Sequence, residues 1–183
     1  DFPITDDHAS KGFAMDLLVR FNPGALISIE RCSLTSEGTY LNMLGRDISS
    51  NTAKVDYLFD EHPASVGIGD GGNEIGMGNL AEYMPQIDKL PDVPAATRVT
   101  KLIVTSVSNW GGYGLVAALS RISGKNLLPS VESETAMLHG MIEAGVVDGT
   151  TGNAVPTVDN FSAEENGALL DRLHRAVESA GTT

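Results

Sequence analysis

A short glycine-rich stretch holds the residues best suited to chemistry. Residues 67–78 read GIGDGGNEIGMG, with six glycines and the side chains of Asp70, Asn73 and Glu74. Carboxylates can exchange protons with a substrate, and backbone amides in such a loop can bind an anion. The stretch therefore indicates a site where a small polar molecule meets two carboxylates and the amides of Gly71, Gly72 and Asn73.

Two other interpretations of this stretch stay open. The glycines could serve only a tight strand-to-helix turn, where positive φ angles and close packing favour glycine. Residues 67–72 also fit the G-x-G-x-x-G pattern of nucleotide-binding loops. A dinucleotide site needs an acidic residue at a second strand end about 20 residues later, but residues 89–94 lack strand character. No Gly-Lys-Ser/Thr follows either, so a substrate loop is the favoured interpretation.

The surrounding pattern predicts strands that alternate with helices. Strands are expected at residues 25–29, 65–69 and 102–107, the last apolar enough to be buried on both faces. Helices are expected at 13–21, at 55–59 with Thr52 as cap, at 74–84, after Asn109, around 137–142 and from 163 to 180, with a capping box at residues 162–165. We therefore predict a three-layer αβα fold with a mostly parallel sheet, as a single domain over residues 1–183.

Polar residues follow each predicted strand. Glu30 and Arg31 end the first, residues 70–74 follow the second, and residues 108–112 (SNWGG) follow the third. Carboxyl ends of parallel strands meet at one edge of a sheet, so these groups should converge there. Arg31 is the natural partner for a substrate carboxylate, although Glu30 and Arg31 could also form a plain surface ion pair. Asn109 could also be a helix cap and Trp110 a packed residue.

Composition limits the partners. The chain carries 24 acidic and 12 basic residues, a net charge of −12. We therefore expect neither nucleic acid nor membrane surfaces as partners. The single cysteine, Cys32, fits a reducing compartment, so we expect a cytoplasmic location, or the mitochondrial matrix in a eukaryote. The four histidines are too scattered for a zinc site. Asp70, Glu74 and Asp148 could together hold a hard divalent ion.

These motifs together resemble those of the D-glutamate cyclase family. The resemblance rests on Glu30-Arg31, residues 38–45 (GTYLNMLG), the glycine stretch, residues 108–112 and residues 147–149 (VDG). It implies cyclisation of D-glutamate to 5-oxo-D-proline with loss of water, a reaction that requires no redox cofactor. Family members are longer at the amino end, which leaves open that this chain lacks an amino-terminal segment.

The implied reaction suggests a role for each candidate. Asp70 and Glu74 would form the acid/base pair, with neither role assigned to either residue. Arg31 would bind the α-carboxylate, the amides of Gly71, Gly72 and Asn73 would stabilise the tetrahedral intermediate, and Asn109 and Tyr40 would position the substrate. The predicted substrate contacts are completed by Glu30, Asn42, Ser108 and Trp110. The alternative is a binding or sensor domain for an amino acid, without turnover; either protein could be a homo-oligomer.

Overall fold

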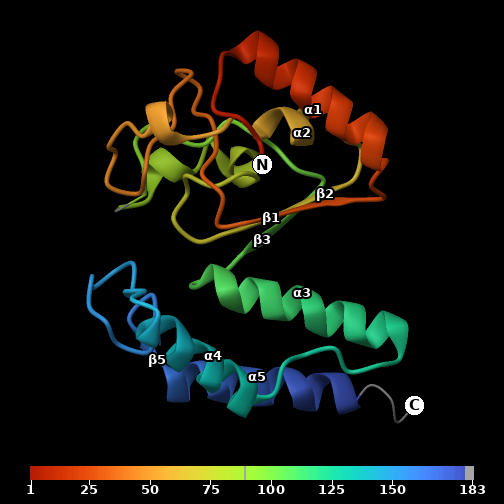
Figure 1. The fold of residues 1–183 in the computed structure, drawn as a ribbon, viewed down its shortest axis with the longest axis vertical. Coiled ribbons are helices and arrows are strands. Elements are labelled where there is room, and N and C mark those ends of the chain that lie inside the picture. The colour runs from red at the N-terminus through yellow and green to blue at the C-terminus, as the bar shows by residue number, and fades with distance from the viewer. Residues whose placement is uncertain (89, 180–183) are drawn as a thin grey trace. The chain divides into compact units, whose positions relative to one another are not determined.

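The strands form a three-stranded parallel sheet. The computed structural model describes residues 1–88 and 90–179. Strands β1 (Leu26–Ile29), β2 (Ser65–Gly69) and β3 (Lys101–Val104) lie in the order β1-β2-β3. Both strand pairs are parallel (Figure 1). The predicted α/β fold with a parallel sheet is therefore confirmed, and the three strands lie within two residues of their predicted starts.

The chain divides into two compact units, residues 1–108 and 109–183. The first holds the sheet together with α1 (Asp7–Phe21) and α2 (Asp56–Glu61), which contact each other. The second holds nearly all of α3 (Ser108–Ser123), together with α4 (Val131–Glu143), α5 (Ala163–Ser179) and a short antiparallel pair, β4 (Thr157–Val158) and β5 (Phe161–Ser162). That the two units act as a single domain stays a prediction.

In the first unit, one face of the sheet is covered by α2 and by the segment after β2. Phe59 of α2 and Ile75 pack with Val99 in a buried cluster that also contacts Leu26 of β1 and Leu102 of β3. A second cluster joins Met77, Met84 and Ala95 nearby. The glycine-rich stretch is therefore anchored to the sheet by apolar side chains on its carboxyl-terminal side.

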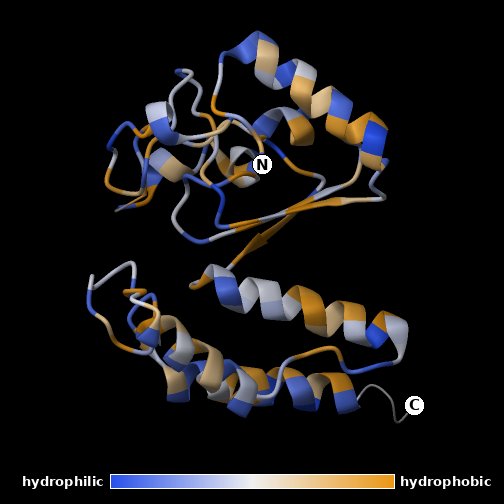
Figure 2. Cartoon of the chain, in the orientation of Figure 1, coloured by the Kyte–Doolittle hydropathy of each residue, from blue (hydrophilic) through white to orange (hydrophobic). Residues whose placement is uncertain are grey.

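In the second unit, three helices share a core. Ala117 of α3, Leu128 and Leu170 of α5 are buried together. Helix α5 carries apolar residues along one side and charged residues along the other, as Figure 2 shows. Its start is the predicted capping box, in which Ser162 and Glu165 each accept a backbone amide of the other, at 3.2 and 2.8 Å. Ala180, which was predicted to lie on the apolar side of this helix, falls outside the described residues.

The helix predicted at residues 74–84 is wrong. The segment forms two short 3-10 turns, η2 (Met77–Leu80) and η3 (Met84–Gln86). Gly76 has a φ of 105°, which right-handed helix cannot accommodate. The amides of Gly76 and Gly78 instead donate to the carbonyl of Thr97, at 3.0 and 3.2 Å. Tertiary hydrogen bonds have therefore replaced the helical ones.

Three finer predictions also need correction. Thr52 does not cap α2, because its hydroxyl donates to the carbonyl of Ile48 and the cap position is Val55. Asn109 is not a cap either, since α3 begins at Ser108. Strand β3 is not buried on both faces: it lies at the sheet edge and Val104 is 57% exposed.

Candidate active site

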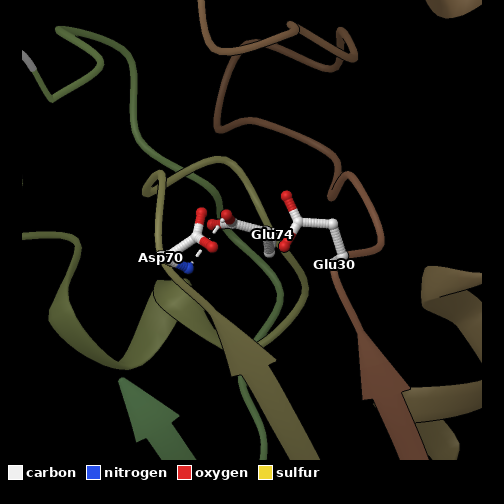
Figure 3. Close-up of side chains that lie close together, drawn as sticks. All are labelled: Glu30, Asp70 and Glu74. Carbon is white, nitrogen blue, oxygen red and sulfur yellow. Dashed lines mark hydrogen bonds between the residues drawn. The ribbon is translucent and has the colours of Figure 1, made fainter. Parts of the chain in front are cut away.

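Three carboxylates converge at the carboxyl ends of β1 and β2. Glu30 follows β1, Asp70 follows β2, and Glu74 lies four residues further along the loop. Each offers an oxygen, and these oxygens all lie within 4.8 Å of one another. Figure 3 shows the three side chains pointing toward one another. The strand-end argument therefore placed Glu30 and Asp70 correctly at one edge of the sheet.

Glu30 is held in an unusual backbone conformation. Its amide donates to the carbonyl of Ile68 at 3.0 Å, which extends the β1–β2 ladder by one residue. Its φ is 57°, in the left-handed region that side chains other than Asn, Asp and Gly seldom adopt. The turn bends the chain at the end of β1, and the exposed Glu30 side chain lies beside the other two carboxylates.

Asp70 is positioned by the start of α3. One of its oxygens, Oδ2, accepts hydrogen bonds from the amide of Ser108 at 2.8 Å and from its hydroxyl at 3.1 Å. Ser108 is fully buried. The structure thus joins two predicted site residues, and it gives Ser108 the function of fixing the Asp70 carboxylate.

Glu74 is buried and only half satisfied. It is 2% exposed, and its Oε1 accepts the amides of Asp70 at 3.1 Å and Gly71 at 2.6 Å. Its Oε2 is buried without a hydrogen-bond partner. The Gly71 amide is therefore occupied by Glu74, which corrects the prediction that this amide binds a substrate anion. The amides of Gly72 and Asn73 donate to no group among the described residues.

The loop that carries Glu74 is bound to the segment after β1. Ile75 donates its amide to the carbonyl of Arg31 at 2.8 Å, and Ser33 donates to the carbonyl of Asn73 at 2.8 Å. The side-chain amide of Asn73 donates to the carbonyl of Leu41 at 3.0 Å. Asn73 thus connects the loop to residues 38–45. Cys32 lies between these bonds, and burial raises the pKa of its thiol, which disfavours a nucleophilic thiolate.

Arg31 is partly committed to the protein itself. Its Nη2 donates to the carbonyl of Ala53 at 2.7 Å. A guanidinium has five N–H donors, so this single bond leaves others for a carboxylate ligand. A substrate contact for Arg31 stays a prediction.

Tyr40 belongs to a buried network around Asp56. Both residues are 1% exposed, and the Tyr40 hydroxyl donates to Oδ2 of Asp56 at 2.6 Å. The other oxygen, Oδ1, accepts from the amide of Leu34 at 2.9 Å and from the hydroxyls of Ser33 and Thr97 at 3.1 and 2.5 Å. Burial and the neighbouring carboxylate raise the pKa of Tyr40. Tyr40 therefore has a structural role, and its contact with substrate stays a prediction.

Asn42 shapes a turn. Its Oδ1 accepts the amides of Leu44 and Arg46, both at 3.0 Å. These bonds close the turn between Leu41 and Asp47, which form an isolated antiparallel bridge. Asn42 therefore has a turn-forming function, and its contact with substrate stays a prediction.

Trp110 and Asn109 belong to the second unit. The indole of Trp110 donates to Oδ1 of Asn166 at 2.6 Å, and its ring lies 4.7 Å from that of Phe161. Asn109 is exposed and lines a cavity of about 150 Å³ between α4 and residues 146–149 and 155–159. The packing alternative for Trp110 is thus supported by specific contacts.

Asp148, the third predicted metal ligand, is fully satisfied by its own loop. Oδ1 accepts the amides of Thr150 and Thr151 at 3.0 and 2.8 Å. Oδ2 accepts the amide of Asn160 at 3.0 Å and the hydroxyl of Thr157 at 2.7 Å. The Asn160 amide is the largest of the influences that hold the pKa of Asp148 far below its usual value. Four donors on one carboxylate mark a structural residue.

The geometry agrees with a family assignment. An α/β protein with carboxylates gathered at the strand ends has the architecture in which ligands bind beyond the carboxyl ends of a parallel sheet. The chain belongs to the family described as D-glutamate cyclase-like, C-terminal, which matches residues 4–174. It is 32% identical over 165 residues to the human protein named D-glutamate cyclase, mitochondrial. That match covers 74% of this chain and 27% of the human protein, so the chain spans about a quarter of its relative.

No helix among residues 1–88 and 90–179 combines the length and apolar character needed to cross a membrane.

Proposed function

We propose that this chain carries the catalytic carboxylates of a D-glutamate cyclase, which converts D-glutamate to 5-oxo-D-proline and water. The observation that carries the proposal is the convergence of Glu30, Asp70 and Glu74 at the strand ends, in a chain of the D-glutamate cyclase-like family. The human relative is named for the same activity.

The reaction needs proton transfer and stabilisation of negative charge. The α-nitrogen of the substrate forms a bond to the γ-carboxyl carbon, and one γ-oxygen leaves as water. The ammonium nitrogen gives up two protons and the departing oxygen takes up two, so the protons balance and no atom is oxidised or reduced. A carboxylate that accepts a proton from the α-nitrogen can later return that proton to the departing oxygen.

Asp70 and Glu74 are the proposed acid/base pair. The Ser108 bonds use one oxygen of Asp70 and the loop amides use one oxygen of Glu74. Each residue therefore keeps a second oxygen for the reaction while the first fixes its orientation. The amides of Gly72 and Asn73 are the proposed donors to the tetrahedral oxyanion, and Arg31 is proposed to bind the α-carboxylate.

The test is turnover with matched variants. The chain is incubated with D- and L-glutamate, and 5-oxoproline is measured by chiral chromatography. We expect product from D-glutamate, and we expect Asp70→Asn and Glu74→Gln each to lower kcat by about 10²–10⁴-fold. Glu82→Gln is the control, because it makes the same chemical change at an exposed residue outside the cluster.

Two results would contradict the proposal. Binding of D-glutamate without product would identify an amino-acid sensor instead of an enzyme. Full activity in both Asp70→Asn and Glu74→Gln would place the catalytic groups elsewhere.

The expected cellular location is the cytoplasm or the mitochondrial matrix, since the single cysteine fits a reducing compartment and the human relative is named as mitochondrial.

A further inference from the structure

We propose that the cavity of the second unit binds a small organic cation, in which an ammonium group is attached to an apolar body about the size of a benzene ring. The cavity has a volume of about 150 Å³ and lies between α4 and residues 146–149 and 155–159. Its lining residues all belong to the second unit, residues 109–183. Binding at this cavity does not depend on the proposed reaction.

The walls of the cavity are largely apolar. Met137, Leu138 and Met141 of α4 line it, together with Val147 and Val155 from the loops that follow. Met137 and Val147 are each 50% exposed. Exposed apolar side chains gathered around a hollow favour an apolar ligand, and methionine adapts its shape to what it contacts. An engineered cavity of about 150 Å³ in another protein binds benzene, so we expect a ligand body of about that size.

The charged residues of the lining are all acidic. They are Glu134, Asp148 and Asp159, and the described residues that line the cavity include no lysine, arginine or histidine. The pKa of Asp148 is held far below its usual value, mainly by the Asn160 amide, so this residue is ionised at neutral pH. A cleft lined by charges of one sign focuses the potential and attracts the opposite charge. The cavity should therefore prefer a cation to a neutral molecule, and a neutral molecule to an anion.

Glu134 is the proposed partner of the ammonium group. It is 4% exposed, and within the described part of the chain it forms no ion pair. Burial raises the pKa of Tyr113, and so does the hydrogen bond from the Tyr113 hydroxyl to Glu134. The ionised form of a buried carboxylate needs a counter-charge or several donors. Asp148 has four donors, whereas Glu134 has the Tyr113 hydroxyl and an ammonium would supply the counter-charge.

The experiment records methyl NMR spectra of the chain, labelled at its methionine methyl groups, with benzylammonium as the probe. Met137 and Met141 line the cavity, while Met43 and Met77 do not and serve as internal references. We expect saturable shifts of the Met137 and Met141 signals at millimolar probe, with the references unchanged. Benzyl alcohol and benzoate carry the same ring with no charge and with a negative charge. Benzyl alcohol should bind more weakly than benzylammonium, and benzoate should not bind.

A matched pair of variants separates the effect of Glu134 from that of the net charge. Glu134→Gln keeps the shape of the side chain and an acceptor for Tyr113. It should weaken benzylammonium binding by about tenfold or more and leave benzyl alcohol binding unchanged. Glu132→Gln makes the same chemical change at an exposed residue of α4 outside the lining, and it should leave both affinities unchanged. The comparison of the probes on the unchanged chain requires no variant to fold.

Each outcome decides the proposal. Absence of saturable shifts at Met137 and Met141 with benzylammonium would overturn it, and so would equal affinity for the cationic, neutral and anionic probes. Unchanged affinity in Glu134→Gln, or an equal loss in Glu134→Gln and Glu132→Gln, would also overturn it, because the net charge of the chain would then attract the probe. No turnover enters these measurements, so the outcome is independent of whether the chain converts D-glutamate.

Discussion

Three buried carboxylates in this chain differ in how their oxygens are used, and the difference separates structure from chemistry. Asp56 and Asp148 each accept four hydrogen bonds that involve both oxygens. Glu74 accepts two, both at the same oxygen. A satisfied carboxylate is fixed by its surroundings, whereas an unsatisfied one has capacity for a ligand. Counting donors at each oxygen is therefore a better guide to the site than burial alone.

Asp148 should make the stability of the protein depend on acid pH. Its folded-state pKa is depressed, so its contribution is complete above the unfolded-state value of about 4 and is lost as pH falls from there toward the folded-state pKa. Asp148→Asn should lower the free energy of unfolding by about 1–3 kcal/mol at pH 7, because an amide cannot accept all four donors. The difference between the two proteins should be smaller at pH 3. Urea unfolding at both pH values measures it.

Asp16→Asn is the control for this measurement. Asp16 is an exposed residue of α1, and its replacement should leave the free energy of unfolding nearly unchanged at both pH values. An effect of Asp148→Asn that is the same at pH 7 and pH 3 would show that the Asp148 carboxylate is not held in its ionised form.

At the scale of elements, the glycines of residues 67–78 serve two kinds of close contact, with backbone segments and with side chains. A Cβ on Gly78 would lie 2.3 Å from the carbonyl oxygen of Ala96, and one on Gly67 would lie 2.4 Å from that of Ile75. A Cβ on Gly69 would instead lie 2.9 Å from the Glu74 carboxylate, and one on Gly71 would lie 3.1 Å from it. The stretch therefore combines close packing on one side with room for a carboxylate on the other.

Alanine substitutions should have opposite effects at two glycines. Gly78→Ala should lower the free energy of unfolding by about 1–3 kcal/mol or more, because the new Cβ would meet the backbone carbonyl of Ala96, which cannot rotate away. Gly114→Ala in α3 should raise it by about 0.5–1 kcal/mol, since nothing lies within 4 Å of the new Cβ and alanine favours helix. Urea unfolding of the two variants measures both. Equal stability of Gly78→Ala and the unchanged chain would show that the segment at residues 96–97 is not tightly packed there.

The same elements show what the sequence could and could not predict. The β2 bounds and the capping box of α5 followed from local signals, namely residue preference and the Ser-x-x-Glu spacing. The strand-end rule placed Glu30 beside Asp70. The absence of a helix at residues 74–84 depends on hydrogen bonds to Thr97, which is distant in sequence. The bond from the Gly71 amide to Glu74 depends on a turn of unusual shape. Local propensity carries no information about either.

At the scale of the whole chain, negative charge dominates. The net charge is −12 on 183 residues. Such a protein repels an anionic substrate over distances of about one Debye length, roughly 10 Å at 0.1 M salt and 30 Å at 0.01 M. A local positive group such as Arg31 acts only at contact distance. Repulsion by the net charge and attraction by a local positive group differ in range. Varying the salt concentration therefore separates them, because salt screens the long-range repulsion more strongly.

Salt should therefore assist the proposed reaction. Raising NaCl from 0.01 M to 0.15 M should increase kcat/KM for D-glutamate, by several-fold, because the long-range repulsion is screened. Steady-state kinetics at constant pH measure it, and KCl in place of NaCl is the control for a specific ion effect. A fall in kcat/KM with salt would show that attraction by a local positive group outweighs the net charge of the chain.

The Asp56 network has a consequence for the kinetics of folding. Its carboxylate collects donors from residues 33, 34, 40 and 97, which are separated from it by 16 to 41 positions along the chain. Loops of this length must close before any of these bonds can form, and closing them is the slow part of building non-local structure. The bonds should consequently be absent from the transition state and present only in the native state. Interactions of that kind slow unfolding more than they speed folding, so Asp56 should act chiefly on the lifetime of the folded chain.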